Sequence, residues 1–166
     1  MRLNNFLRNI FAIPLLSFAL TICLCAQGSQ PRGAGSTDER QIKQVLARYA
    51  ESIDEADVRL ASKVWLNSPA VSFIHPQGDE QGFAQIEHNF YQSLMRDTFS
   101  ERHLKPRDVA IHVYGRSAWV EFFWDFDAKV RKDGSSISTH GRETQVYWKM
   151  KTGWRLVHVH YSGMPA

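Results

Sequence analysis

His140-Gly-Arg-Glu-Thr-Gln-Val-Tyr-Trp-Lys149, Met150-Lys-Thr-Gly153 and Trp154-Arg-Leu-Val-His-Val-His160-Tyr-Ser-Gly-Met-Pro165 are consecutive segments, and together they decide the fold. Two runs rich in aromatic and β-branched residues flank a short turn that contains Gly153. This pattern is typical of a β-hairpin. The sequence therefore predicts that the chain ends in two antiparallel strands.

Side chains alternate between the two faces of a strand. In the first strand, alternation places Arg142, Thr144, Val146 and Trp148 on one face and Glu143, Gln145 and Tyr147 on the other. In the second strand, it predicts one face with Trp154, Leu156, His158 and His160 and an opposite face with Arg155, Val157, Val159 and Tyr161.

Three motifs of this hairpin resemble the end of nuclear transport factor 2-like domains, also called SnoaL-like domains. The motifs are Glu143-Thr-Gln-Val-Tyr147, Gly153-Trp154 and Val157-His-Val-His-Tyr-Ser-Gly-Met-Pro165. They are most similar to the association domain of calcium/calmodulin-dependent protein kinase II, and the similarity extends from about Asp38 to the C-terminus. The resemblance implies an α+β fold of the cystatin-like cone type, with three N-terminal helices packed on a strongly bent antiparallel sheet. It implies little about activity, because one fold hosts many functions.

The N-terminus has the pattern of an export signal, with Arg2 and Arg8 before an apolar run from Ile10 to Ala26. A polar stretch with several glycines and serines follows it. We therefore expect a signal peptide (1–26), a flexible linker (27–37) and one domain (38–166), in a secreted or periplasmic protein. An uncleaved N-terminal anchor is the alternative.

Composition excludes several classes of function. The chain has 166 residues and a formal charge of +3, and its basic residues are scattered, so nucleic-acid binding is not indicated. Both cysteines lie in the expected signal peptide, so the mature domain needs no disulfide. His158 and His160 can point the same way, but two histidines without a third ligand do not make a metal site. We expect no metal and no cofactor.

Helical periodicity predicts three helices, from Thr37 or Asp38 to about Glu55, from Asp57 to near Asn67, and over Phe83–Met95. Strands are predicted at Ala70–His75, Arg102–Tyr114 and Ser117–Val130, with a turn or tiny hairpin at Gln77–Gly82. Helices followed by an antiparallel meander favour the α+β class.

A second resemblance, to ketosteroid isomerases, implies a site in the conical cavity between helices and sheet. Arg48-Tyr-Ala-Glu-Ser-Ile53 resembles their first helix, whose tyrosine donates to a developing oxyanion. Val71-Ser-Phe-Ile-His-Pro-Gln-Gly78 resembles their strand that ends in the general base. The resemblance therefore implies Tyr49 as oxyanion donor and His75 as base, and their second oxyanion donor falls near Thr144. Tyr49 can equally be a core aromatic residue, and His75 can simply close its strand.

Arg142, Trp65 and Tyr161 are the candidate ligand-binding residues. Arg142 can pair with a ligand carboxylate or phosphate, or it can neutralise Glu121 across the sheet. We expect the domain to bind a small, partly apolar or acidic organic molecule. Whether it also performs acid–base chemistry of the isomerase, cyclase or dehydratase type stays open.

The alternative function is a non-catalytic oligomerisation module, as the similarity to the association domain implies. In both cases we expect self-association through the sheet, as a homodimer or a larger ring. We expect no stable insertion into a membrane after the signal peptide is removed.

Export can be tested directly. Mass spectrometry of protein expressed with its native N-terminus is expected to find a mature chain that starts between Gln27 and Ser29, because small residues precede these positions. An exported chain that retains Met1, or that carries lipid on a cysteine, would contradict the signal-peptide assignment.

Overall fold

The computed structural model describes residues 32–163, so the expected signal peptide lies outside the described residues. The helices are α1 (Arg32–Asp54), α2 (Val58–Val64), α3 (Phe83–Gln85) and η1 (Ile86–Asp97), a π-helix that continues α3. The strands are β1 (Ser72–His75), β2 (Gly78–Gln81), β3 (Phe99–Tyr114), β4 (Ser117–Val130), β5 (Ser136–Met150) and β6 (Gly153–Gly163). Helix α1 begins at Arg32, within the segment that we expected to be linker.

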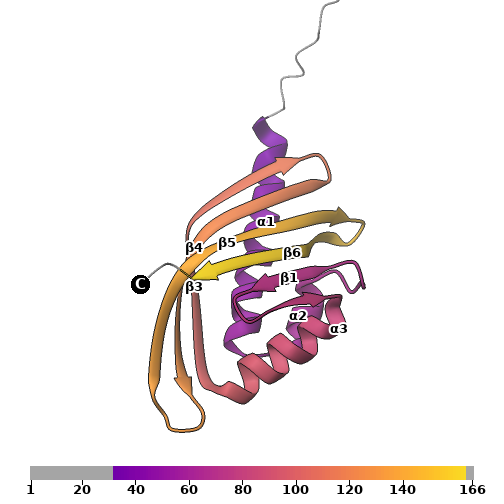
Figure 1. The fold of residues 1–166 in the computed structure, drawn as a ribbon. Helices are drawn as coiled ribbons and strands as arrows, with labels where there is room; N and C mark the ends of the chain where they lie inside the picture. The colour runs from indigo at the N-terminus through magenta and orange to yellow at the C-terminus, as the bar shows by residue number, and fades with distance from the viewer. Residues whose placement is uncertain (1–31, 164–166) are drawn as a thin grey trace, which may run out of the picture. The chain divides into compact units, whose positions relative to one another are not determined.

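The strands form one six-stranded sheet in the order β2-β1-β6-β5-β4-β3, with the helices on one side of its curve (Figure 1). The α+β class and the packing of three helices on a bent sheet are confirmed. The sheet is mixed rather than antiparallel, because β1 pairs with β6 in parallel. A parallel pair needs a long crossover connection, and here the whole meander from β2 to β5 provides it. Within residues 32–163, no helix is both long enough and apolar enough to span a bilayer.

The core lies between the helices and one face of the sheet, which we call the inner face. The apolar residues of α1, which recur at helical spacing, are buried: Ile42, Val45, Leu46, Tyr49 and Ile53. Strand β4 alternates, with Ala118, Val120, Phe122 and Trp124 buried against the helices. The opposite face of the sheet, the outer face, carries Glu121 and other exposed side chains.

A β-bulge in β6 overturns one prediction from alternation. Tyr147 pairs with Leu156, but Val146 pairs with His158, so Val157 is an extra residue in the strand. An extra residue resets the alternation. Trp154 and Leu156 therefore share the inner face with Val159 and Tyr161, whose side chains are buried or half-buried. His158 and His160 lie on the outer face.

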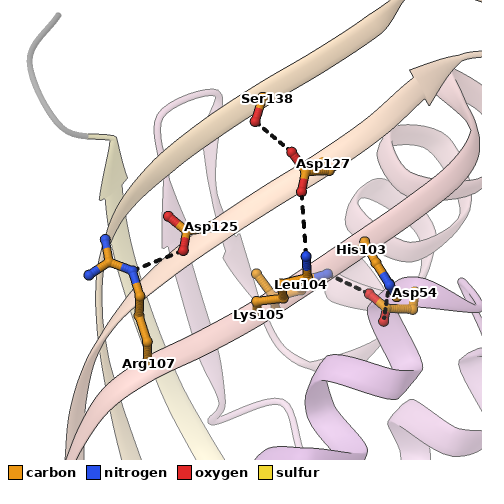
Figure 2. Close-up of polar contacts among 8 residues, drawn as sticks. All are labelled: Asp54, His103, Leu104, Lys105, Arg107, Asp125, Asp127 and Ser138. Atoms are coloured by element: carbon orange, nitrogen blue, oxygen red, sulfur yellow. Dashed lines mark hydrogen bonds and ion pairs between the residues drawn. The ribbon is translucent and has the colours of Figure 1, made fainter.

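The C-terminal end of α1 is fastened to β3. Asp54 accepts a hydrogen bond of 2.7 Å from the Leu104 backbone and lies 3.3 Å from His103 (Figure 2). The Arg102 guanidinium donates to the Ile53 and Asp54 carbonyl oxygens, at 3.1 and 3.0 Å. A cation at a helix C-terminus satisfies carbonyl groups that have no partner inside the helix. These contacts hold the last turns of α1, including Tyr49, over the inner face.

Candidate active site

A cavity of about 250 Å³ lies between the helices and the inner face. Most of its wall is apolar and comes from η1, α1 and the inner faces of β3, β4 and β5: Ile53, Phe90, Leu94, Met95, Phe99, Leu104, Trp124, Phe126 and Ile137. The polar side chains in the wall are Tyr49, Gln77, Thr139, Glu143 and Tyr161. No lining residue is a lysine, arginine or histidine.

Glu143 is the ionisable group at the centre of this polar set. It lies on the inner face of β5 and is 4% exposed. Its carboxylate Oε1 accepts a hydrogen bond of 2.7 Å from Gln145 Nε2, and the Tyr49 hydroxyl lies close enough to the same carboxyl group to lower its pKa. Gln145 in turn accepts from the Tyr147 hydroxyl. Three successive inward-facing residues of β5 thus form one buried polar row.

Burial raises the pKa of Glu143 from 4.5 to about 7, although the hydrogen bonds from Gln145 and Tyr49 act in the opposite direction. A carboxyl with this pKa is present in both its acid and its base form near neutral pH. Such a group can donate a proton or accept one, which is the requirement for general acid–base chemistry.

Two tyrosines flank the carboxyl. Tyr49, from α1, is 1% exposed, and burial together with the negative charge of Glu143 raises its pKa well above the ordinary value. Tyr161 pairs with Glu143 across β5 and β6, and burial raises its pKa to about 12. Both phenols therefore remain protonated at neutral pH and can act as hydrogen-bond donors.

The Trp124 ring forms another part of the wall, and it lies over Gly141 of β5. A Cβ atom at position 141 would lie 2.4 Å from Trp124 Cζ2 and 2.1 Å from the Ser162 carbonyl oxygen. Only glycine leaves room for this contact. Trp124 also meets Tyr161 edge to face, with 5.6 Å between ring centroids. Gly141 thereby allows the indole ring to pack against β5 and β6 beside the cavity.

His75 borders the cavity without lining it. Its ring stacks on the ring of Tyr161, with 5.9 Å between centroids and 12° between planes. The next two residues, Pro76 and Gln77, do line the cavity. His75 therefore lies directly behind the wall, whereas the resemblance to ketosteroid isomerases implied a place in the cavity itself.

Arg142 and Trp65 lie elsewhere. Arg142 is exposed on the outer face, where it pairs with Phe123 and Ser162 in the sheet register. Trp65 is fully buried at the end of α2 and packs on Phe73, with 5.8 Å between ring centroids. The structure thus brings Tyr49 and Tyr161 together at the cavity, with His75 behind them, and it separates Arg142 and Trp65 from them.

Sequence reasoning missed Glu143. It placed the second oxyanion donor near Thr144, but Thr144 points to the outer face and Glu143 points to the cavity. Alternation correctly separated Glu143, Gln145 and Tyr147 from Arg142. It did not indicate which set is buried, because the set with Val146 and Trp148 is the more apolar one. The neighbouring β4, whose apolar face is unambiguous, carries the missing signal: Phe122 pairs with Glu143 and must share its face.

A second hollow, of about 610 Å³, is polar and lies near Asp54, His103 and Asp127. Its lining residue Asp127 already has polar partners (Figure 2): Ser138 donates to its carboxylate at 2.5 Å, and Lys105, outside the hollow, lies 3.9 Å from it. Within the described part of the chain, no three His, Cys, Asp or Glu side chains gather as metal ligands would. The cavity beside Glu143 is therefore the candidate active site.

Comparison with known proteins agrees with the fold. A family model described as SnoaL-like domain matches residues 42–166. A nuclear transport factor 2-like superfamily protein of Salmonella enterica serovar Typhimurium is 49% identical, with a TM-score of 0.77 over 79% of this chain and 94% of that one. A putative dehydratase of the same superfamily from Streptomyces avermitilis is 22% identical, with a TM-score of 0.71 over 79% and 99% of the two chains. The association domain of C. elegans CaMKII is 16% identical, with a TM-score of 0.63 over 78% and 98%. No protein of curated function matches the chain in sequence.

The pKa of Glu143 predicts a specific dependence of stability on pH. The folded-state pKa of about 7 lies above the unfolded-state value of 4.5, so this group favours the folded state most at low pH and that contribution is lost as pH rises towards 7. Between pH 5 and pH 8 the loss amounts to about 2–3 kcal/mol. Glu143→Gln keeps the shape of the side chain but cannot ionise. Relative to wild type, the variant is expected to gain about that much unfolding free energy over this interval, measured by urea denaturation.

Glu121→Gln is the control, because Glu121 is exposed on the outer face and its loss leaves the buried carboxyl intact. If Glu143→Gln and wild type show the same change in unfolding free energy between pH 5 and pH 8, Glu143 does not have a raised pKa.

Proposed function

The chain belongs to the SnoaL-like family, and we propose that its domain, exported from the cell, binds a small, uncharged and largely apolar organic molecule beside Glu143. The observation that carries this proposal is the buried carboxyl with a pKa of about 7 in the wall of an otherwise apolar cavity. Cavities that bind organic ligands typically combine an apolar wall with a few convergent polar groups. An anionic ligand is disfavoured, because no cationic side chain lines the wall to pair with it.

The polar groups suit proton transfer beside a carbonyl. When a base removes the proton from carbon, the electron pair moves onto the carbonyl oxygen, which becomes negative. The Tyr49 hydroxyl and the acid form of Glu143 can both donate hydrogen bonds to that oxygen in a site of low polarity. In this proposal His75 takes the proton. Isomerisation, cyclisation and dehydration all contain such a step.

A putative dehydratase is among the structures of similar fold, although at 22% identity it supports the fold alone. Support for catalysis therefore comes from the residues of the site, and variants of these residues test it.

A matched pair of probes tests the proposal. 2-Naphthol is a neutral bicyclic phenol that resembles the enol of 2-tetralone, and its binding can be followed by quenching of tryptophan fluorescence. We expect saturable binding that Tyr49→Phe weakens about tenfold, the usual value of one hydrogen bond. Exchange of the α-protons of 2-tetralone in D₂O is expected to be accelerated by wild type and slowed ~10²-fold or more by His75→Ala.

Tyr114→Phe is the matched control, because Tyr114 is an exposed tyrosine on the outer end of β3. If 2-naphthol does not bind, or if Tyr49→Phe and Tyr114→Phe bind it equally well, the cavity does not have the proposed role. Binding without α-proton exchange would reduce the proposal to a binding protein.

A second candidate function, assembly, has its own observation. The outer face exposes Tyr114, Trp119 and Trp148 to 62%, 37% and 48%. Trp119 stacks between Tyr114 and His112, at centroid distances of 5.2 and 4.7 Å. Large aromatic groups are depleted from free surfaces and enriched in interfaces. We propose that two copies of the domain associate through this face, which leaves the cavity on the inner face available.

Light scattering tests the assembly. The wild-type domain is expected to be a dimer or a larger oligomer at micromolar concentration, because association removes the three aromatic side chains from water. Replacing both Trp119 and Trp148 by Glu is expected to give a monomer, whereas Lys63→Glu on α2 is expected to have no effect. A wild-type monomer would refute the assembly.

A further inference from the structure

A second buried carboxylate, that of Glu80, lies behind the cavity and has no part in the proton transfer described above. Glu80, on β2, is 8% exposed and faces the same side of the sheet as Phe73. Its Oε2 atom accepts a hydrogen bond of 2.6 Å from Asn89 Nδ2 of η1. Its Oε1 atom lies 3.5 Å from His75 Nε2. Within the described residues, no lysine or arginine forms an ion pair with Glu80.

The imidazole is held as tightly as the carboxylate. The His75 side chain is 5% exposed and is surrounded by the rings of Phe73, Phe90 and Tyr161, with centroid distances of 5.3 to 5.9 Å. Its Nε2 atom is buried and makes no hydrogen bond to the described residues, and the Glu80 carboxylate, at 3.5 Å, faces it. The other ring nitrogen, Nδ1, lies 3.2 Å from the side-chain amide oxygen of Gln77, which lines the cavity.

The carboxylate beside Nε2 favours the form of the ring that carries its proton there. A buried carboxylate needs hydrogen-bond donors, and Asn89 supplies one of them. The Nε2–H group of His75 is the other donor within reach. A neutral imidazole that is protonated at Nε2 has its lone pair at Nδ1. That lone pair is directed to Gln77, whose amide oxygen faces Nδ1; with the amide turned over, its N–H₂ group donates to Nδ1 instead.

Gly78 lies against the pair formed by His75 and Glu80. A Cβ atom at position 78 would lie 3.3 Å from Glu80 Oε1 and 3.6 Å from His75 Nε2. The turn between β1 and β2 therefore leaves just enough room for the carboxylate and the ring to face each other. The contact between His75 and Glu80 could not be predicted from the sequence, because it depends on the register in which His75 pairs with Gly78.

We propose that Glu80, itself fixed by Asn89, is a positioning residue that holds His75 in the Nε2–H form, so that Nδ1 is the atom that takes a proton from a ligand in the cavity. This inference rests on the proposed function, because it assigns the base for that chemistry. In this step the carbon–hydrogen bond of the ligand breaks, and the proton forms a bond with Nδ1. The electron pair stays on the ligand, whose carbonyl oxygen becomes an oxyanion beside Tyr49. Gln77 must turn aside for Nδ1 to reach the ligand.

Nitrogen-15 NMR of the imidazole rings tests the inference without any ligand. At alkaline pH, where the ring is neutral, wild-type His75 is expected to be protonated at Nε2 and unprotonated at Nδ1, with the signals assigned by their loss in His75→Gln. Glu80→Gln can either donate to the ring or accept from it. This variant is expected to raise the fraction of the Nδ1–H form severalfold. Glu121→Gln is the matched control, since Glu121 lies 3.8 Å from His112 on the outer face.

Kinetics separate positioning from a merely structural role. In α-proton exchange of 2-tetralone, Glu80→Gln is expected to lower kcat about tenfold or more and to leave KM unchanged, because the ligand does not touch Glu80. Wild-type His75 protonated at Nδ1, or unchanged ring signals in folded Glu80→Gln, would overturn the inference. If 2-naphthol still binds in either case, this inference fails and the proposed ligand site stands. If 2-naphthol does not bind to wild type, the ligand site itself fails.

Discussion

The fold buries a carboxyl group beside a cavity without giving it a cation, and the candidate site depends on this constraint. Glu143 forms no ion pair within residues 32–163, and the polar groups beside it, Gln145 and Tyr49, are neutral. Desolvation of an ionised carboxylate is costly, so the group retains its proton to a higher pH than in water. The same burial that costs stability at alkaline pH makes the group useful as an acid at neutral pH.

The constraint also explains how the surrounding elements are arranged. Tyr49 reaches the carboxyl because Asp54 and Arg102 fix the end of α1 on β3. Tyr161 reaches it because β6 places that residue directly opposite Glu143. The cavity persists among these groups because they are held by three different elements, and the aromatic side chains of η1 and β4 close the remaining wall. Two buried carboxyls, Glu143 and Glu80, thus lie on different strands, and Tyr161 belongs to the surroundings of both.

Most of the fold could be predicted from the sequence, because the hydrophobic pattern is clear in elements that bury only one face. The stripe of α1 and the alternation of β4 each have a single apolar face, so burial follows from the pattern. On β5 both faces mix polar and apolar side chains, and there the pattern did not decide between Arg142 and Glu143. The β5 residues are buried or exposed according to their neighbours on β4, which is tertiary information.

The candidate site was predictable only in part for the same reason. Tyr49 lies on a periodic helix, and His75 ends a short strand, so resemblance and periodicity were enough to select both. The pairing of His75 with Glu80 depends on a two-strand register that no periodicity encodes. The orientation of His158 and His160 depends on a single irregular residue.

That irregular residue has a consequence for how the chain can change in length. All β5–β6 pairs on either side of Val157 are regular, and the two sets differ in register by one residue. A chain that lacked residue 157 would restore an unbroken ladder, with every other side chain still on its present face. A loss or gain of one residue elsewhere in β6 that left the bulge in place would exchange the two faces on one side of the change and turn Tyr161 away from Glu143. A homologue with a gap of one residue at position 157 can therefore keep an intact cavity. In an alignment of the last strand, the residues before and after position 157 should each be matched separately.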